Sequence, residues 1–98
     1  MRAQLLDKTV LIDGEMRNVY GLASFRCRPK KLGIGTHALR AFEDIARRYD
    51  KFCIVGFADD NVVLNFYLKA GYQFHFEYEG KYLFTSVHVK SITVTEKW

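Results

Sequence analysis

The chain has 98 residues, 49% of them hydrophobic, with seven glycines and one proline, which predicts a single globular domain over residues 1–98 and excludes a disordered or fibrous protein. Its longest uncharged run, Phe52 to Ala58, is far shorter than the ~20 residues of a membrane-spanning helix, so we expect a cytoplasmic protein without a membrane partner. The net charge of +4 suits an anionic ligand as well as a nucleic acid.

The first two elements are predicted to be strands of one hairpin. Apolar residues at Leu5, Leu6 and Val10 to Ile12 lead to the turn signal Asp13–Gly14. The stretch NVYGLASFRC then supplies the second strand. The two strands should therefore pair and close near Asp13–Gly14.

Two helices and a buried strand are predicted next. From Ile34 to Tyr49 the apolar residues recur every three or four positions, which is the pattern of an amphipathic helix of about four turns. The apolar run FCIVGFA is typical of a strand covered on both faces, as in a parallel sheet. The stretch DDNVVLNFYLKAG begins with acidic residues and ends with Lys69 and Gly71, which predicts a second helix.

The stretch YQFHFEY alternates and predicts a half-buried strand. We expect its aromatic residues Phe74, Phe76 and Tyr78 in the core, and His75 on the other face. After a turn at Glu79–Gly80, one or two more strands follow. The fold class is therefore α/β (α+β), a mixed sheet with two crossover helices in the order β-β-α-β-α-β-β.

The glycine pair in KKLGIGTHA, Gly33 and Gly35, admits three interpretations. The glycines can simply let the chain bend before the helix. They also fit the G-x-G-x-x-A pattern of a dinucleotide-binding fold, but the segment from Arg26 to Leu32 is too long for its tight turn, and 98 residues cannot hold its two halves. In the third interpretation, backbone N–H groups at the helix start wrap a pyrophosphate, and Lys30 and Lys31 add positive charge.

This loop resembles the signature R/Q-x-x-G-x-G/A of the GNAT acyltransferase superfamily, with Lys30 in the place of arginine or glutamine. A second family motif, an asparagine followed by FYxKxGF, resembles DNVVLNFYLKAGYQF, with Tyr67, Lys69 and Gly71 in the expected places. Both motifs stand in the family's order, and the resemblance spans roughly residues 8 to 90. It implies an acyl-CoA-binding fold that begins at a hairpin, without the family's usual N-terminal strand and helices.

The resemblance also implies which residues act. In the family, the strand before the loop splays from the next parallel strand and pairs with the pantetheine arm, and a tyrosine at the place of Tyr67 often protonates the leaving thiolate, as a positioned phenol can. Lys31 replaces a usual glycine, and Asp60, beside Asn61, replaces a usual asparagine. The expected acetyl-CoA-binding residues are Ser24, Phe25, Arg26, Lys30, Lys31, Leu32, Gly33, Ile34, Gly35, Thr36, Asp60, Asn61 and Lys69.

The expected function is therefore transfer of an acetyl group from acetyl-CoA to an unidentified amine by direct attack. The stretch VYGLASF has no carboxylate, so Glu15, Glu77, Glu79 and an ordered water are the candidate bases. Three alternatives stay open: a CoA-binding domain without turnover, a half-domain completed by a partner, and a nucleic-acid-binding module based on RCRPKK. We also expect a homodimer that covers exposed hairpin surface. The histidines and cysteines lack metal-ligand spacing, so no metal is expected.

Overall fold

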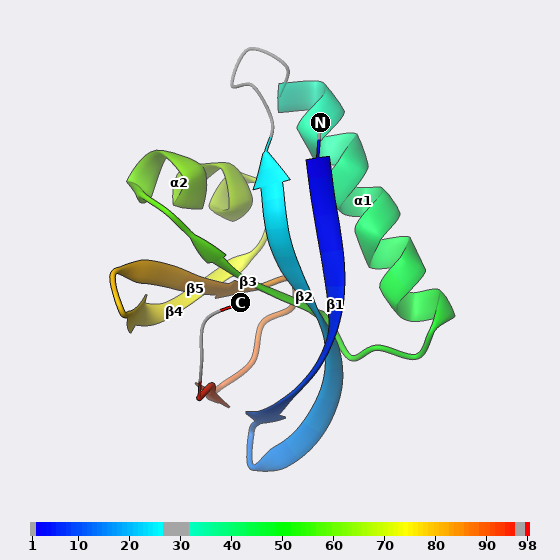
Figure 1. Cartoon of the computed structure of the whole chain (residues 1–98), viewed down its shortest axis with the longest axis vertical. Coiled ribbons are helices and arrows are strands. Elements are labelled where there is room, and N and C mark those ends of the chain that lie inside the picture. Colours follow the sequence, from blue (N-terminus) through cyan, green and yellow to red (C-terminus); the bar gives the residue numbers. More distant parts are fainter. Residues whose placement is uncertain (1, 27–31, 96–97) are drawn as a thin grey trace.

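The computed structural model describes residues 2–26, 32–95 and 98. Two helices, α1 (Leu32–Arg48) and α2 (Asn61–Lys69), accompany one sheet. Its strands are β1 (Arg2–Ile12), β2 (Glu15–Arg26), β3 (Ile54–Ala58), β4 (Gln73–Tyr78), β5 (Lys81–Thr85) and β6 (Ile92–Thr93). They lie in the order β4-β5-β3-β2-β1-β6, with β2 and β3 parallel and the other neighbours antiparallel (Figure 1). The predicted mixed sheet with two helices is confirmed.

The hairpin of β1 and β2 turns at Asp13 and Gly14, as predicted. Both turn residues have positive φ, 51° and 84°, a region that glycine adopts freely and aspartate tolerates. The Asp13 carboxylate also accepts hydrogen bonds from the backbone N–H groups of Lys90 and Ser91, each at 2.8 Å. The turn therefore holds the segment that leads into β6.

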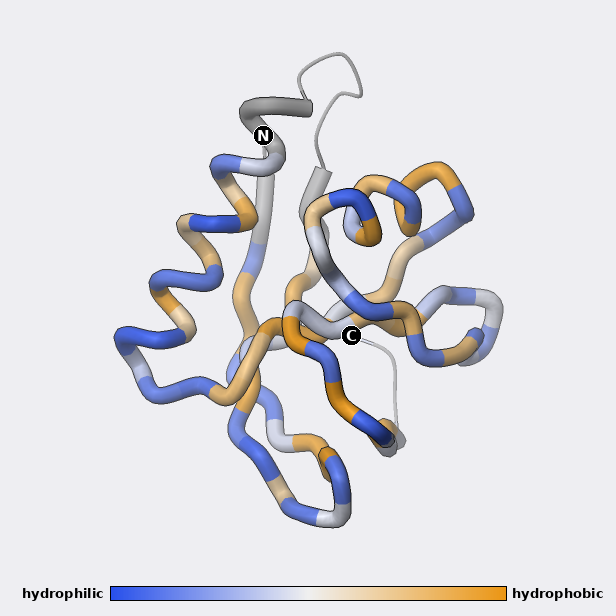
Figure 2. The backbone as a smooth tube through the Cα atoms, turned by 180° about the vertical axis from the view of Figure 1, so that it is seen from behind, coloured by the Kyte–Doolittle hydropathy of each residue, from blue (hydrophilic) through white to orange (hydrophobic). Residues whose placement is uncertain are grey.

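Both helices pack on one face of the sheet, which we call the helix face. α1 contributes Leu39 and Ala46 to its core, and α2 contributes Leu64 and Tyr67. Figure 2 shows hydrophilic and hydrophobic residues alternating along α1, the pattern from which this helix is predicted. The sheet completes this core with Leu22, Ile54, Ala58 and Phe84, joined by Tyr72 from the turn before β4.

The opposite face of the sheet, which we call the second face, carries its own core. Its buried residues are Val10, Ile12, Val19, Cys53, Val55, Leu83 and Ile92, and Phe57, Val89, Val94 and Trp98 pack against them. β3 therefore contributes Ile54 to one core and Val55 to the other, which confirms that it is covered on both faces. Burial raises the pKa of the Cys53 thiol to about 12, so this cysteine stays protonated and unreactive at neutral pH.

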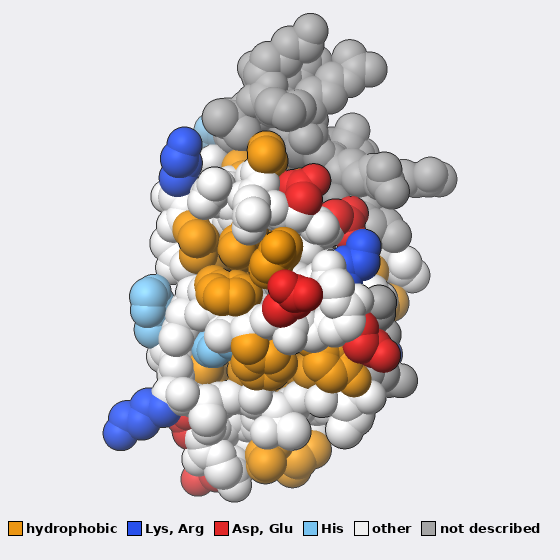
Figure 3. All heavy atoms as spheres, turned by 90° about the vertical axis from the view of Figure 1, so that its left-hand side faces the viewer, with side chains coloured by type: hydrophobic (Ala, Val, Ile, Leu, Met, Phe, Trp, Pro, Cys, Tyr) orange, Lys and Arg blue, Asp and Glu red, His pale blue; other side chains and the backbone are white. Residues whose placement is uncertain are grey.

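The prediction that the aromatic residues of β4 are buried is wrong for Phe74 and Phe76, which are 39% and 38% exposed. β4 is an edge strand, and its register with β5 shifts between Phe74 and Glu77. Burial does alternate from Gln73 to Phe76, but Phe74 and Phe76 lie on the more exposed side of this edge strand. Figure 3 shows apolar side chains exposed on the side of the molecule formed by α2 and β4. A bulge also opposes pairing of an edge strand with another chain.

The half-buried His75 connects β4 to the end of β5. Its Nε2 lies 2.8 Å from Thr85 Oγ1, and the Thr85 hydroxyl donates to the carbonyl of Val87 at 2.6 Å. The Thr85 oxygen is therefore left to accept the His75 N–H. Burial lowers the pKa of His75 from its ordinary 6.5, nearby His88 lowers it further, and Asp13 acts in the opposite direction. Folding thus favours the neutral imidazole.

We expect the protein to lose stability as the pH falls through and below 6.5, the ordinary pKa of His75. The unfolded chain takes up the proton more readily than the folded chain, so this contribution is complete above that pH and is lost as the pH falls toward the lower folded-state pKa. Urea unfolding midpoints at about pH 7.5 and about pH 5.5 measure the loss. His75→Gln keeps a hydrogen-bonding side chain without the titration, and its midpoint should change less. Equal changes in both proteins would contradict this assignment.

Candidate functional site

β2 and β3 pair over a short stretch and then separate. Their parallel register runs from Tyr20–Ile54 to Leu22–Gly56, and among the residues that the structure describes no later pair joins them. β2 nevertheless continues along β1, and β3 continues along β5. β2 thus stays paired with β1, and β3 stays paired with β5, while the edges that β2 and β3 turn toward each other diverge (Figure 1). We call these diverging ends, residues 23–26 of β2 and 57–58 of β3, the fork.

The fork presents backbone groups that lie outside the ladder between β2 and β3. Backbone N–H and C=O groups form hydrogen bonds wherever they can. An extended ligand between the two strands would satisfy them in the manner of an added strand. The predicted cofactor-binding residues Ser24, Phe25 and Arg26 all belong to the fork.

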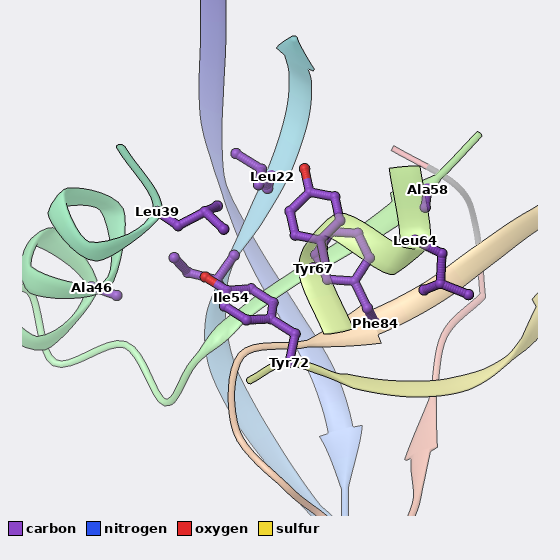
Figure 4. Close-up of a cluster of buried hydrophobic side chains, with 9 residues drawn as sticks. All are labelled: Leu22, Leu39, Ala46, Ile54, Ala58, Leu64, Tyr67, Tyr72 and Phe84. Carbon is purple, nitrogen blue, oxygen red and sulfur yellow. The ribbon is translucent and has the colours of Figure 1, made fainter. Parts of the chain in front are cut away.

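Tyr67 of α2 lies on the helix-face side of the fork. The residue is only 3% exposed, and its ring stacks on Phe84 with centroids 3.9 Å apart and planes 20° apart. Figure 4 shows its hydroxyl pointing away from Phe84, on the side of Leu22 near the end of β2. α2 is fixed here because Asp60 caps its N-terminus and accepts the Val63 N–H at 2.9 Å. The predicted proton donor therefore has a defined position beside the fork.

The packing beneath Tyr67 depends on Gly56, the last β3 residue that pairs with β2. A Cβ at this position would stand 2.5 Å from Phe84 Cζ. The Phe84 ring therefore lies directly on the backbone of β3, with Tyr67 stacked above it. Glycine at this position allows the two aromatic rings to approach the fork.

A hydrogen-bonded network joins α1 to the end of α2. The Tyr72 hydroxyl donates to Glu43 Oε2 at 2.7 Å, and Arg40 donates to both carboxylate oxygens of Glu43 at 2.9 and 3.1 Å. Arg40 also donates to the carbonyl of Ala70 at 2.9 Å. Burial and the bond to Glu43 raise the pKa of Tyr72, which keeps its hydroxyl a donor. The network holds the two helices at a fixed separation.

Between the two helices lies a hollow of about 370 Å³, which we call the interhelix groove. Its lining combines apolar side chains from α2 with two cations, one from each helix. Such a lining suits a ligand that is partly flat and apolar and partly anionic. The lining residues are Thr36, Arg40, Val62, Asn65, Phe66, Lys69 and Ala70.

The structure brings only some of the predicted cofactor-binding residues to the interhelix groove. Thr36 and Lys69 line it, whereas Asp60 is the helix cap and Asn61 is the exposed first residue of α2. Residues 32–35, which include both predicted glycines, form the first turn of α1, so the helix begins earlier than its apolar pattern predicts. Lys30 and Lys31 lie outside the described residues.

Sequence reasoning missed most of the groove. Arg40 stands four residues after Thr36 on α1, and Phe66 stands four residues after Val62 on α2. This spacing places each pair on one side of its helix. The spacing was visible in the sequence, but the fact that these two sides face each other depends on how the helices pack.

The predicted general bases do not gather at the fork. Glu15 begins β2 at the hairpin end and pairs with Arg17 at 2.8 Å. Glu77 is exposed on β4, and Glu79 lies in the turn after β4 with a φ of 48°. A proton leaving an amine at the fork would therefore have to pass to water or to a group other than these three carboxylates.

Within the part of the chain that the structure describes, no helix is long and apolar enough to cross a membrane. No three histidine, cysteine, aspartate or glutamate side chains in that part are grouped so that they could hold a metal ion.

No relative of known function assigns a role to the fork, to Tyr67 or to the interhelix groove. Comparison of the chain with protein-family models, with curated proteins and with solved structures finds no match in any of the three.

Proposed function

We propose that this chain is an N-acetyltransferase of the GNAT type, which binds acetyl-CoA at the fork and transfers its acetyl group to an amine. The observation that carries the proposal is the fork, where the parallel pairing ends at Leu22–Gly56 while both strands continue. The pantetheine arm of CoA is an extended chain with amide groups, so it can form strand-like hydrogen bonds with such edges. Tyr67 beside the fork supplies a phenol close to where the thioester would lie.

The start of α1 and the interhelix groove suit the nucleotide end of CoA. The first turn of a helix has unpaired N–H groups and a partial positive charge, which favour phosphate. Lys69 adds positive charge along the groove, where the charge of Arg40 is paired with Glu43, and Val62 and Phe66 offer apolar surface for a flat base. The chain around the fork can thus contact a CoA molecule along its length.

The proposed reaction is a direct attack at the thioester. The amine nitrogen forms a bond to the carbonyl carbon and loses a proton to water, and the carbon–sulfur bond breaks. The Tyr67 hydroxyl donates its proton to the departing thiolate and is reprotonated from solvent once CoA has left. Backbone N–H groups of the fork stabilise the negative charge that develops on the carbonyl oxygen. The low exposure of Tyr67 keeps bulk water from its hydroxyl.

The first test is binding of acetyl-CoA to the purified protein, measured by calorimetry and by thermal unfolding. At about a hundredfold excess over Kd, a specific ligand stabilises the folded state by about 2.7 kcal/mol. For a domain of this size that corresponds to an increase in Tm on the order of 10 °C. ATP, which has the nucleotide without the pantetheine arm, serves as the control and should bind more weakly. The absence of any shift at millimolar acetyl-CoA would remove the proposal.

A CoA-binding domain without turnover is the second candidate function. It is favoured by the positions of Glu15, Glu77 and Glu79, none of which belongs to the fork. Release of free CoA thiol from acetyl-CoA, assayed with a panel of alkyl and aromatic amines, distinguishes the two candidates. Tight CoA binding without thiol release across the panel would favour the binding domain.

A further inference from the structure

The interhelix groove carries one positive charge that no carboxylate balances. Arg40 donates to both carboxylate oxygens of Glu43, so its charge is paired on α1. Lys69 is the other cation of the lining, and no hydrogen bond or ion pair joins its side chain to another residue that the structure describes. Aspartate and glutamate are absent from the described lining. The groove therefore attracts an anion, and Lys69 is the group that can bind it.

The C-terminal end of α2 is prepared for an anion at Lys69. Carbonyl groups at the end of a helix lack intrahelical partners and give that end a partial negative charge. The carbonyl groups on either side of Lys69 nevertheless have donors. The Leu68 carbonyl accepts the Gly71 N–H at 3.0 Å, and the Ala70 carbonyl accepts a hydrogen bond from Arg40 at 2.9 Å. These bonds reduce the negative charge that the helix end presents to an anion bound at Lys69.

The α2 side of the groove presents an apolar row beside a polar row. Val62 and Phe66 form the apolar row, and Asn65 and Lys69 form the polar row, each pair four residues apart on the helix. The ring of the half-buried Phe66 meets that of Tyr67 edge to face, with centroids 5.3 Å apart and planes 70° apart. A flat ring laid against the apolar row would bring its polar edge to Asn65 and a charged substituent to Lys69.

Asn65 has the chemistry to distinguish one flat ring from another. Its amide carries a donor and an acceptor side by side, and no described residue bonds to this exposed side chain. Adenine presents the complementary pair, an amino donor next to a ring-nitrogen acceptor, whereas guanine presents two acceptors at the corresponding edge. The hollow of about 370 Å³ is at the small end of the usual range of ligand sites, ~300–1,000 Å³, which suits a nucleoside better than an entire CoA molecule.

We propose that the interhelix groove recognises the 3′-phosphoadenosine group of the cofactor, with Asn65 selecting adenine and Lys69 binding the 3′-phosphate. The inference rests on the proposed function, in which the pantetheine arm lies at the fork and the pyrophosphate at the start of α1. Phe66 in the groove and Tyr67 beside the fork are neighbours on α2, so one extended ligand can reach both. Asn65 and Lys69 then determine cofactor affinity and specificity, and they take no part in the chemistry at the thioester.

The test compares, by calorimetry, ligands that differ in one group. Adenosine 3′,5′-bisphosphate should bind about tenfold more tightly than adenosine 5′-monophosphate, since it adds one charge-assisted contact. It should bind about five- to tenfold more tightly than guanosine 3′,5′-bisphosphate, since guanine does not match the Asn65 amide. Equal affinities for the bisphosphate and the monophosphate would overturn the role of Lys69, and equal affinities for the two bases would overturn that of Asn65.

Three variants assign these preferences to single side chains. Lys69→Met should lower the affinity for adenosine 3′,5′-bisphosphate about tenfold and leave that for the monophosphate unchanged. Asn65→Ala should abolish the preference for adenine over guanine and keep the preference for the 3′-phosphate. Lys90→Met is the matched control, because it removes the same charge from an exposed lysine whose backbone is bound to Asp13 at the hairpin turn. An equal loss in Lys90→Met and Lys69→Met would mean that net charge alone is responsible, and would overturn the inference.

Acetyl-CoA without its 3′-phosphate, used as acyl donor, keeps this inference distinct from the proposed function. Its KM should be about tenfold higher than that of acetyl-CoA and its kcat within about twofold, because the lost contact is far from the reacting atoms. If both donors are turned over with equal KM, the proposed function stands and the groove assignment fails. If adenosine 3′,5′-bisphosphate binds as expected but acetyl-CoA binds no more tightly and releases no thiol, the groove stands as a nucleotide site and the acetyltransferase fails.

Discussion

Replacing Tyr67 by phenylalanine should lower the turnover of acetyl-CoA by about 10²-fold or more and leave its affinity within a few-fold. Phenylalanine keeps the ring that stacks on Phe84 at 3.9 Å, and it removes the hydroxyl that would protonate the thiolate. The two quantities are kcat, from the release of CoA thiol, and Kd, from calorimetry. A loss of both together would indicate a change in folding rather than the loss of a proton donor.

Tyr72→Phe is the matched control for this experiment. Tyr72 belongs to the same core, with its ring 5.6 Å from that of Tyr67, but its hydroxyl donates to Glu43 on α1. Its removal should cost about 1.5–3 kcal/mol of stability, the usual contribution of a hydrogen bond to a charged group, and should leave kcat nearly unchanged. If Tyr67→Phe were as active as wild type, Tyr67 would have no part in the chemistry.

Gly56→Ala should destabilise the protein by about 1–3 kcal/mol, which is the usual cost of overpacking a core. The added Cβ would stand 2.5 Å from Phe84 Cζ, and Phe84, at 1% exposure and stacked on Tyr67, cannot move aside without disturbing the core. For a domain of this size the corresponding decrease in Tm is on the order of 10 °C. Thermal unfolding followed by circular dichroism measures it.

Gly21→Ala provides the comparison, because it makes the same change in the neighbouring strand. Its Cβ would meet Trp98 at 2.6 Å, but Trp98 is half-buried and can swing outward. We therefore expect a loss below about 1 kcal/mol, together with a change in tryptophan fluorescence. Equal losses in the two variants would mean that the packing on the helix face is no tighter than on the second face.

Local patterns predicted the elements whose form depends on nearby residues. The Asp13–Gly14 turn, the apolar period of α1 and the continuous apolar run of β3 each reflect short-range chemistry, and each prediction is confirmed. The prediction for Phe74 and Phe76 failed because alternation along a strand does not show whether either of its sides is covered. The bulge opposite β5 and the edge position of β4 are properties of the assembled sheet, and the seven residues of that stretch do not reveal them.

The candidate site likewise has parts that local sequence predicts and parts that depend on the assembled fold. Tyr67 and the glycine loop are recognisable from motifs that each lie in one stretch of the chain. The interhelix groove combines Arg40 of α1 with Phe66 of α2, and on the second face the ring of Phe57 meets that of Trp98. Each of these contacts depends on packing between segments that are distant in the sequence. No spacing rule along the chain relates the members of such pairs. Only the arrangement of the helices and strands in space brings them together.

The contact between the β1–β2 turn and the segment before β6 has a consequence for folding kinetics. Asp13 bonds residues 77 and 78 positions later in the chain, and β6 pairs with the end of β1. A loop of this length must close before the second face can bury its core. Closing the loop costs conformational entropy, and the contacts that offset this cost form only afterwards. Helices form in about a microsecond, whereas folds dominated by distant pairings need milliseconds to seconds. Folding of this chain should therefore be limited by the docking of its last strand, and nascent chains that lack residues 88–93 should remain incompletely folded.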